Sequence, residues 1–222
     1  MPMATPPTKT KPDGFVFPRL IVWLALVPAI FCLYLAFTYA MVRIGMLQPV
    51  ENRDNPWLER AAEWAPFSPH AQSALARYNR EWALQTSGDE SAAYFERSRV
   101  LWDKAIALRP GWPFYELGAL DAEMLAGVDA GLVQQRFQRL ITMAPNERAM
   151  DERLLSLAFS GWSLLSAEQQ KWVWRRLLDT PAKALSASLK IADQAGLKPL
   201  VCMKGPWVRI KSFCAEPGKR RK

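Results

Sequence analysis

Residues 20–42 form an uninterrupted run of 23 residues without a charged side chain, and this run constrains the fold more than any other feature. As a helix it is about 35 Å long, enough to cross the hydrocarbon core of a bilayer. Pro28 lies inside the run, where a membrane helix tolerates it with a kink. Trp23 and Tyr39 lie near the two ends, where amphipathic rings favour the membrane interface. The sequence therefore predicts a transmembrane anchor at residues 20–42.

A cleaved signal peptide is the alternative interpretation of this run, because Thr38 and Ala40 place small residues around a cleavage site. The apolar region of a signal peptide is usually about 7–15 residues long, so the length favours an uncleaved anchor. Three Lys or Arg residues precede the run and three follow it closely, which leaves the positive-inside rule undecided. We expect residues 1–19 to be a disordered basic tail on the inside and the domain to lie outside, because a cysteine pair favours an oxidising compartment.

The formal net charge of +8 is concentrated at the two ends of the chain. Residues 1–19 carry +2, residues 197–222 carry +7, and residues 20–196 between them carry −1. A nucleic-acid-binding body carries a basic face. The charge distribution therefore argues against nucleic acid as a partner.

The chain has three cysteines and a single histidine, His70. Cys32 lies in the apolar run, whereas Cys202 and Cys214 are spaced to close a short loop. A disulfide there would stabilise the fold by about 2–3 kcal/mol; two unpaired thiols are the alternative. Zinc, haem and Cys–His catalysis lack their usual residues, and we expect no cofactor.

Residues 43–196 carry repeated helix signals and no convincing strand pattern. Asn55 and Ser68 each precede a proline, as an N-cap precedes the first helical residue. Ser166 and Gln169 have the spacing of a capping box. Apolar residues between these signals recur at helical spacing. The sequence predicts an all-α domain over residues 43–196.

Proline corners divide this domain into similar units. Pro66 and Pro110 are 44 residues apart, and Pro110 and Pro145 are 35 residues apart. The second spacing is close to the 34-residue period of tetratricopeptide (TPR) helix pairs, whose repeats commonly end in a proline turn. We expect a TPR-like solenoid of helical hairpins; an irregular helical bundle is the alternative.

Residues 104–143 resemble the VpsP-like polysaccharide biosynthesis proteins, through the Ala-Leu-Arg-Pro-x-Trp-Pro element at 107–113 and the helix pair that follows it. The resemblance extends to the anchor, to Trp162 and to the ending at residues 196–202. It departs from the family pattern at residues 143–146, where members have a Gly-Pro-Trp-like corner. The family implies one membrane span, a place in bacterial exopolysaccharide gene sets, and no catalytic residues.

Arg109, Trp112 and Tyr115 lie around the second proline corner and form the candidate interaction surface. Trp112 is also the best candidate among the ten tryptophans for stacking on a sugar. In helical repeats, however, tryptophan usually packs between helices. Trp172 and Trp174 point to different faces of one helix, so we expect at least one of them to pack inward.

The acidic residues after this corner could form a catalytic pair. Glu116 and Glu123 are two helical turns apart, about 10 Å, near the upper end for an inverting glycosidase. Acidic residues on an amphipathic helix are usually solvated, and we expect Glu116, Asp121 and Glu123 to be surface residues. His70, in a first helical turn, is expected at the surface or in a capping role.

Residues 197–214 contain a Lys-Gly-Pro turn signal between two apolar segments, which predicts a small hairpin that a Cys202–Cys214 disulfide would pin. Residues 215–222 are expected to be a disordered basic tail that attracts anionic lipids or an acidic partner, or that only aids solubility. The charges of this tail are Lys219, Arg220, Arg221 and Lys222.

Together these features predict a non-enzymatic protein of the bacterial inner membrane with a periplasmic helical domain. Its expected role is that of a scaffold in exopolysaccharide biosynthesis or export, with the lipid bilayer and polymerase or export proteins as partners. A glycan-binding accessory protein and an adaptor of another envelope pathway, such as secretion, are the alternatives.

Overall fold

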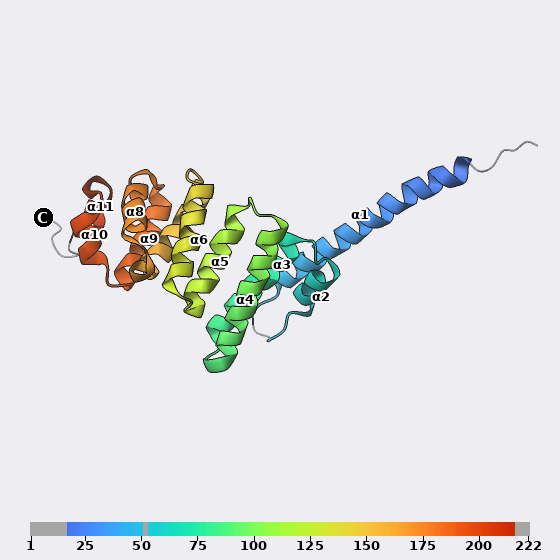
Figure 1. Ribbon diagram of the computed structural model, residues 1–222, viewed down its shortest axis with the longest axis horizontal. Helices are drawn as coiled ribbons and strands as arrows, with labels where there is room; N and C mark the ends of the chain where they lie inside the picture. Colours follow the sequence, from blue (N-terminus) through green and yellow to red (C-terminus); the bar gives the residue numbers. More distant parts are fainter. Residues whose placement is uncertain (1–16, 51–52, 216–222) are drawn as a thin grey trace, which may run out of the picture.

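The computed structural model describes residues 17–50 and 53–215. Over these residues the chain forms eleven α-helices, two short 3₁₀ helices and no strand. The prediction of an all-α chain is therefore confirmed. The helices follow one another along the long axis of the molecule in the order of the sequence, and one helix projects from the end of the row (Figure 1).

The projecting helix is α1, Phe17–Leu47, which includes the charge-free run and continues beyond it. Its segment Val22–Leu47 is long and apolar enough to cross a membrane, a property shared by anchors and signal sequences. Most side chains of this segment are exposed. Its last turns pack against α2, Pro56–Trp64, and α3, Pro69–Gln85.

The end of α1 is part of the folded domain. Met41 and Val42 are buried and share a hydrophobic cluster with Leu58 of α2. Asn55 joins the two helices, because its side-chain oxygen accepts a hydrogen bond from the N–H of Leu58 at 3.1 Å and its amide donates to the carbonyl of Gly45 at 2.9 Å. The predicted N-cap at Asn55 is confirmed, and it also ties α1 to the domain.

The middle of the row consists of α3, α4 (Gly88–Leu108), α5 (Pro113–Ala126) and α6 (Ala130–Met143), each packed against the next. The contact between α4 and α5 depends on a small residue. A Cβ atom on Gly118 would lie 2.4 Å from the Trp102 ring, so glycine is what allows this indole to be buried between the two helices.

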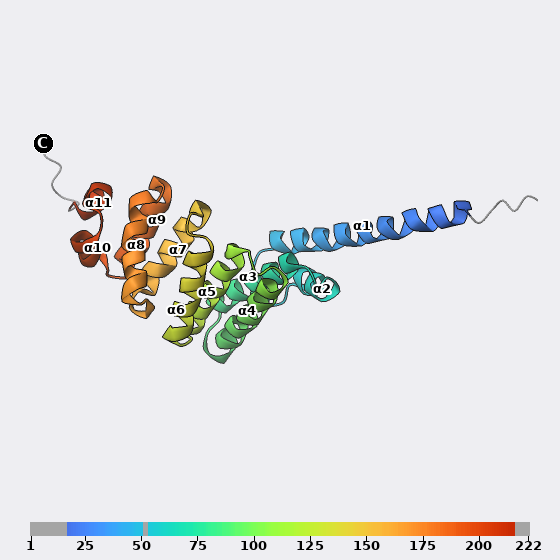
Figure 2. The ribbon, with the colours of Figure 1, turned by 45° about the horizontal axis from the view of Figure 1, so that its top comes forward.

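The second half of the row begins with η1, Arg148–Met150, and α7, Asp151–Ser160. It continues through η2 (Trp162–Leu164), α8 (Ala167–Asp179) and α9 (Ala182–Gln194). This half holds the largest hydrophobic cluster of the described residues. Contacts of α3 with α5, α7 with α9, and α6 with α8 place alternate helices in two rows (Figure 2).

Residues 197–214 are helical, and the prediction of a hairpin of extended segments is wrong. They form α10, Lys198–Lys204, and α11, Trp207–Cys214. Pro199 lies in the first turn of α10 and Pro206 directly precedes α11, positions in which proline favours a helix start.

The disulfide predicted in this segment is present. Cys202 of α10 and Cys214 of α11 are bonded, with their Cα atoms 5.7 Å apart. The bond joins the last two helices of the row. Val201 and Ile210 are the residues of these helices that are buried in the domain core.

Candidate functional site

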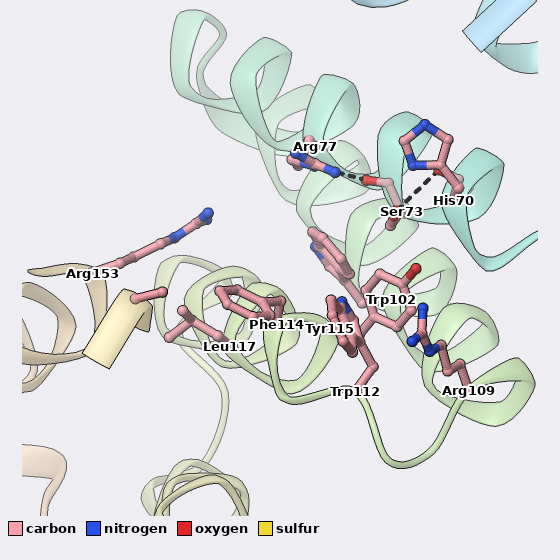
Figure 3. Close-up of a pocket in the computed structure, with 11 residues that line it drawn as sticks. His70, Ser73, Arg77, Trp102, Arg109, Trp112, Phe114, Tyr115, Leu117 and Arg153 are labelled. Atoms are coloured by element: carbon pink, nitrogen blue, oxygen red, sulfur yellow. Dashed lines mark hydrogen bonds between the residues drawn. The ribbon is translucent and has the colours of Figure 1, made fainter. Parts of the chain in front are cut away.

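The three residues of the candidate interaction surface lie together in one cavity. Arg109 follows α4, Trp112 is the N-cap residue of α5, and Tyr115 lies in the first turn of α5. All three line a cavity of about 560 Å³ on the side of the row formed by α3, α5 and α7 (Figure 3). We call this cavity the α3–α5–α7 groove.

Two short-range contacts order the corner between α4 and α5. The guanidinium of Arg109 lies over the Trp112 ring, 4.1 Å from its centroid. The ring centroids of Trp112 and Phe114 are 5.4 Å apart. One face of Trp112 is therefore covered by a cation of its own corner, and the ring is half-buried.

The α3 wall of the groove was not predicted from the sequence. His70, Ser73 and Arg77 line it, and their i, i+3, i+7 spacing places them on one face of α3. The Nε–H of Arg77 donates to the carbonyl of Ser73 at 3.4 Å, and the Ser73 hydroxyl donates to the carbonyl of His70 at 3.0 Å (Figure 3). Three polar residues at this spacing are the sequence signal that could have indicated the wall, although Ser73 itself is fully buried.

Ala149 and Arg153 form the far wall of the groove, contributed by η1 and α7. Arg153 pairs with Asp121 of α5, while its side chain keeps 44% of its surface exposed. No carboxylate of the described residues pairs with Arg77 or Arg109. The groove thus has three arginines and no carboxylate among its lining residues.

Burial and like charge act on the bases of this groove. Desolvation, and then the positive charge of Arg153, lower the pKa of Arg77. Desolvation also lowers the pKa of His70, with smaller effects from Arg77 and Arg43. The site favours a negative charge that would compensate the guanidinium groups.

Two buried donors or acceptors of the groove lack a partner within the described residues. The indole Nε1 of Trp102 has no hydrogen-bond acceptor, although only 2% of this residue is exposed. The Nε2 atom of His70 is likewise buried and unpartnered, and its ring stacks on Tyr39 of α1 with centroids 5.9 Å apart. Buried polar atoms usually have a hydrogen-bond partner, and these two atoms have none among the described residues.

The acidic residues of α5 are buried, and the prediction that they are surface residues is wrong. Glu116 accepts a hydrogen bond from Arg136 at 2.8 Å and pairs with Arg139 at 3.3 Å. Glu123 pairs with Arg136 at 2.7 Å. Asp121 accepts hydrogen bonds from Arg80, at 3.2 Å, and from Arg153.

Arg136 is the centre of this arrangement. It also reaches Asp103 of α4, at 3.0 Å, so one guanidinium joins α4, α5 and α6. Burial alone would lower the pKa of Arg136, but its three carboxylate partners outweigh burial and raise it. We call Arg136, Arg139 and their carboxylate partners Asp103, Glu116 and Glu123 the Arg136 network. Every carboxylate in it is engaged by arginine, which is the arrangement of a structural ion-pair network and not of an acid–base pair.

The remaining predicted residues are placed as follows. Trp172 packs edge-on against Phe137, and Trp174 packs against Trp162 with ring centroids 4.8 Å apart, so both contribute to the domain interior. Within the described ranges, no group of three or more His, Cys, Asp or Glu side chains is placed to hold a metal ion. The basic tail, Lys219, Arg220, Arg221 and Lys222, lies outside the described residues, as does most of the N-terminal tail.

Comparison with protein-family models, with curated proteins and with solved structures finds no match for this chain.

Proposed function

We propose that the protein is a membrane-anchored scaffold whose helical domain binds an acidic segment of a partner protein in the α3–α5–α7 groove. The observation that carries this proposal is the lining of the groove, with three arginines, four aromatic side chains and no carboxylate. Arginine offers five donors in a rigid fork that matches a carboxylate. Aromatic and arginine side chains are also the residues that contribute most to protein–protein binding.

The arrangement of the helices supports a TPR-like solenoid as the scaffold. Helices α3 to α6 pack in chain order, α3 also contacts α5, α7 packs on α9, and α3, α5 and α7 line the groove. Stacked helix pairs create extended concave surfaces of this kind, which repeat proteins use for binding.

The packing of α1 supports an uncleaved anchor. Cleavage after Ala40 would cut the helix between Thr38 and Met41, two buried residues that pack in the domain. The disulfide between Cys202 and Cys214 supports an oxidising compartment, and hence a periplasmic domain behind an inner-membrane span.

The resemblance of residues 104–143 to VpsP-like proteins supplies the proposed pathway, exopolysaccharide biosynthesis or export in bacteria. The partners would then be polymerase or export proteins. Crosslinking in membranes followed by mass spectrometry tests this part, and Arg77→Gln serves as the control for capture through the groove. If only secretion components were recovered, and equally with the wild-type chain and with Arg77→Gln, the result would favour the alternative of a secretion adaptor.

A binding measurement tests the groove itself. The full chain in nanodiscs is titrated into a fluorescent glutamate-rich peptide and the anisotropy is recorded. Arg77→Gln should weaken binding about tenfold, since one exposed charge-assisted contact is lost. Arg175→Gln is the matched control, because Arg175 is an exposed arginine on α8 outside the groove. Equal affinities of the two variants would refute the proposed groove.

The same titration addresses the glycan-binding alternative, for which the Arg109–Trp112 pair is the supporting observation. A uronic-acid oligosaccharide replaces the peptide, and Trp112→Ala is compared with the wild-type chain. Tighter binding of the oligosaccharide than of the peptide, lost in Trp112→Ala, would favour an acidic glycan as the ligand.

A further inference from the structure

The corner between α2 and α3 carries two large aromatic side chains that the domain does not cover. Trp64 and Phe67 are each 50% exposed, although both lie beside well-packed helices. Pro66 lies between them and Ser68 caps α3 directly afterwards. The N–H of Ser68 donates to the carbonyl of Ala65 at 2.9 Å, so the corner is a tight turn.

These two rings are held against α1. Trp64 contacts Phe37 with ring centroids 5.9 Å apart, and Phe67 contacts Tyr34 at 6.3 Å. The hydroxyl of Tyr34 also donates a hydrogen bond to the carbonyl of Trp64. The corner is therefore fixed to the helix that is apolar enough to cross a bilayer.

The contact falls inside the charge-free run and not at its end. Tyr34 and Phe37 precede Val42, the last residue of the run, by eight and five residues, which is about 12 Å and 8 Å along a helix axis. The hydrocarbon core of a bilayer is about 30 Å thick. The run exceeds this by only about 5 Å, so the Trp64 and Phe67 rings fall below the level at which the core ends.

We infer that the Trp64–Phe67 corner inserts into the boundary between lipid acyl chains and headgroups, so that the domain rests on the bilayer through α2 as well as through α1. Interfacial segments bury their apolar face about 5–10 Å into this boundary, which agrees with the depth of the contact along α1. Tryptophan favours this level because its ring is amphipathic.

The charges next to the corner are of both signs: Glu59 and Glu63 of α2 are exposed, and two arginines lie nearby. Arg60 lies one turn before Trp64 on α2 and is exposed, and Arg43 is the first charged residue after the run. Long arginine side chains can keep their guanidinium groups at lipid phosphates while their stems cover apolar surface. Figure 2 shows α2 on the side of the domain from which the free part of α1 extends.

The inference rests on the proposed anchor, and site-directed spin labelling separates the two. The full chain carries Cys32→Ser to remove the free thiol and is placed in vesicles of phosphatidylethanolamine and phosphatidylglycerol. A nitroxide is attached at Phe67→Cys, or at Trp64→Cys as an independent second position. Collision rates with oxygen, which partitions into lipid, and with a water-soluble nickel chelate are then compared.

Two reference positions complete the experiment. Leu26→Cys reports the anchor, and Val208→Cys is the matched control, an apolar residue that is 83% exposed on α11 at the opposite end of the row (Figure 1). We expect oxygen to collide more often than nickel at Phe67 and Leu26, and the reverse order at Val208. A label at Phe67 that behaves as at Val208, while Leu26 reports lipid, overturns the inference and leaves the anchor intact. If the nickel chelate reaches the labels at both Leu26 and Phe67, the inserted corner and the proposed anchor are both overturned.

Discussion

The Arg136 network and the α3–α5–α7 groove both contain arginines, but only the network contains carboxylates. In the network, Arg136 is 14% exposed and contacts three carboxylates. In the groove, Arg77 and Arg109 have no carboxylate partner among the described residues. Tyr115 lines the groove and its neighbour Glu116 belongs to the network, so one helix separates the two regions.

The difference agrees with the roles proposed for the two regions. A charge cluster that is neutralised internally joins helices and offers nothing to a ligand. A cluster of arginines that the fold leaves open stabilises nothing by itself, and its charge is available to a partner. Substitutions in the network should therefore change the free energy of unfolding, whereas substitutions in the groove should change binding.

The largest expected effect is at the centre of the network. Arg136→Met would leave Glu123 buried without a counter-charge and Glu116 with only the half-exposed Arg139, and should destabilise the domain by about 3–5 kcal/mol. Denaturant unfolding of the full chain in detergent, followed by circular dichroism, measures this change. Arg175→Met, an exposed site, is the control, and a loss as small as in that control would contradict a structural role for the network.

A smaller effect is expected at Asp121 of α5, which pairs with the groove residue Arg153. Asp121→Asn keeps a hydrogen-bonding side chain but removes the charge that Arg80 and Arg153 share, and should cost about 1–3 kcal/mol. The same change releases Arg153 toward the groove, so the acidic peptide should bind more tightly while the domain becomes less stable. If the stability of the domain and its affinity for the peptide both fell, or both rose, the separate roles of the two regions would be contradicted.

In the groove, Arg77→Gln should change stability by less than about 0.5 kcal/mol. The groove walls desolvate the guanidinium in part, but Arg77 stays in contact with solvent and forms no ion pair with a described residue. Removal of its repulsion with Arg153 favours a slight gain. The same unfolding experiment measures Arg77→Gln and Arg136→Met side by side. A loss of more than about 2 kcal/mol in the free energy of unfolding would show that Arg77 stabilises the fold, as Arg136 is expected to do.

The smallest effect concerns pH. The pKa of His70 is lowered in the folded domain, so the unfolded chain takes up the proton first as the pH falls below the ordinary histidine value of about 6.5. Stability should be unaffected by this group above that pH and decrease below it, until the folded pKa is reached. His70→Gln should remove this part of the pH dependence, measured as unfolding midpoints between about pH 5 and 7.5. An unchanged slope would exclude His70 as its source.

Local signals in the sequence predicted the helix starts well. Asn55 and Ser68 cap their helices as expected, and Ser166 with Gln169 forms the complete capping box. These contacts span only a few residues, so the sequence contains both partners. The corner residues Arg109, Trp112 and Tyr115 were placed together for the same reason.

Long-range partners were not predictable from these signals. The burial of Glu116 depends on Arg136, which lies on the next helix, and the α3 wall of the groove depends on how α3 packs beside α5. Residues 197–214 were misinterpreted because a Gly-Pro turn between apolar segments suits two strands as well as two short helices. The prolines at 199 and 206, each at a helix start, decide the matter only once the helices are seen.

The continuity of α1 has a mechanical consequence. Because α1 passes without a break from its apolar segment into the core of the domain, the proposed anchor would hold the domain on a continuous helix and not on a flexible linker. A flexible linker would let the groove adopt many heights and orientations relative to the bilayer. With this proposed anchor, a continuous helix would instead present the groove at one height and in one direction, so that a membrane-bound partner would meet it by diffusing in two dimensions.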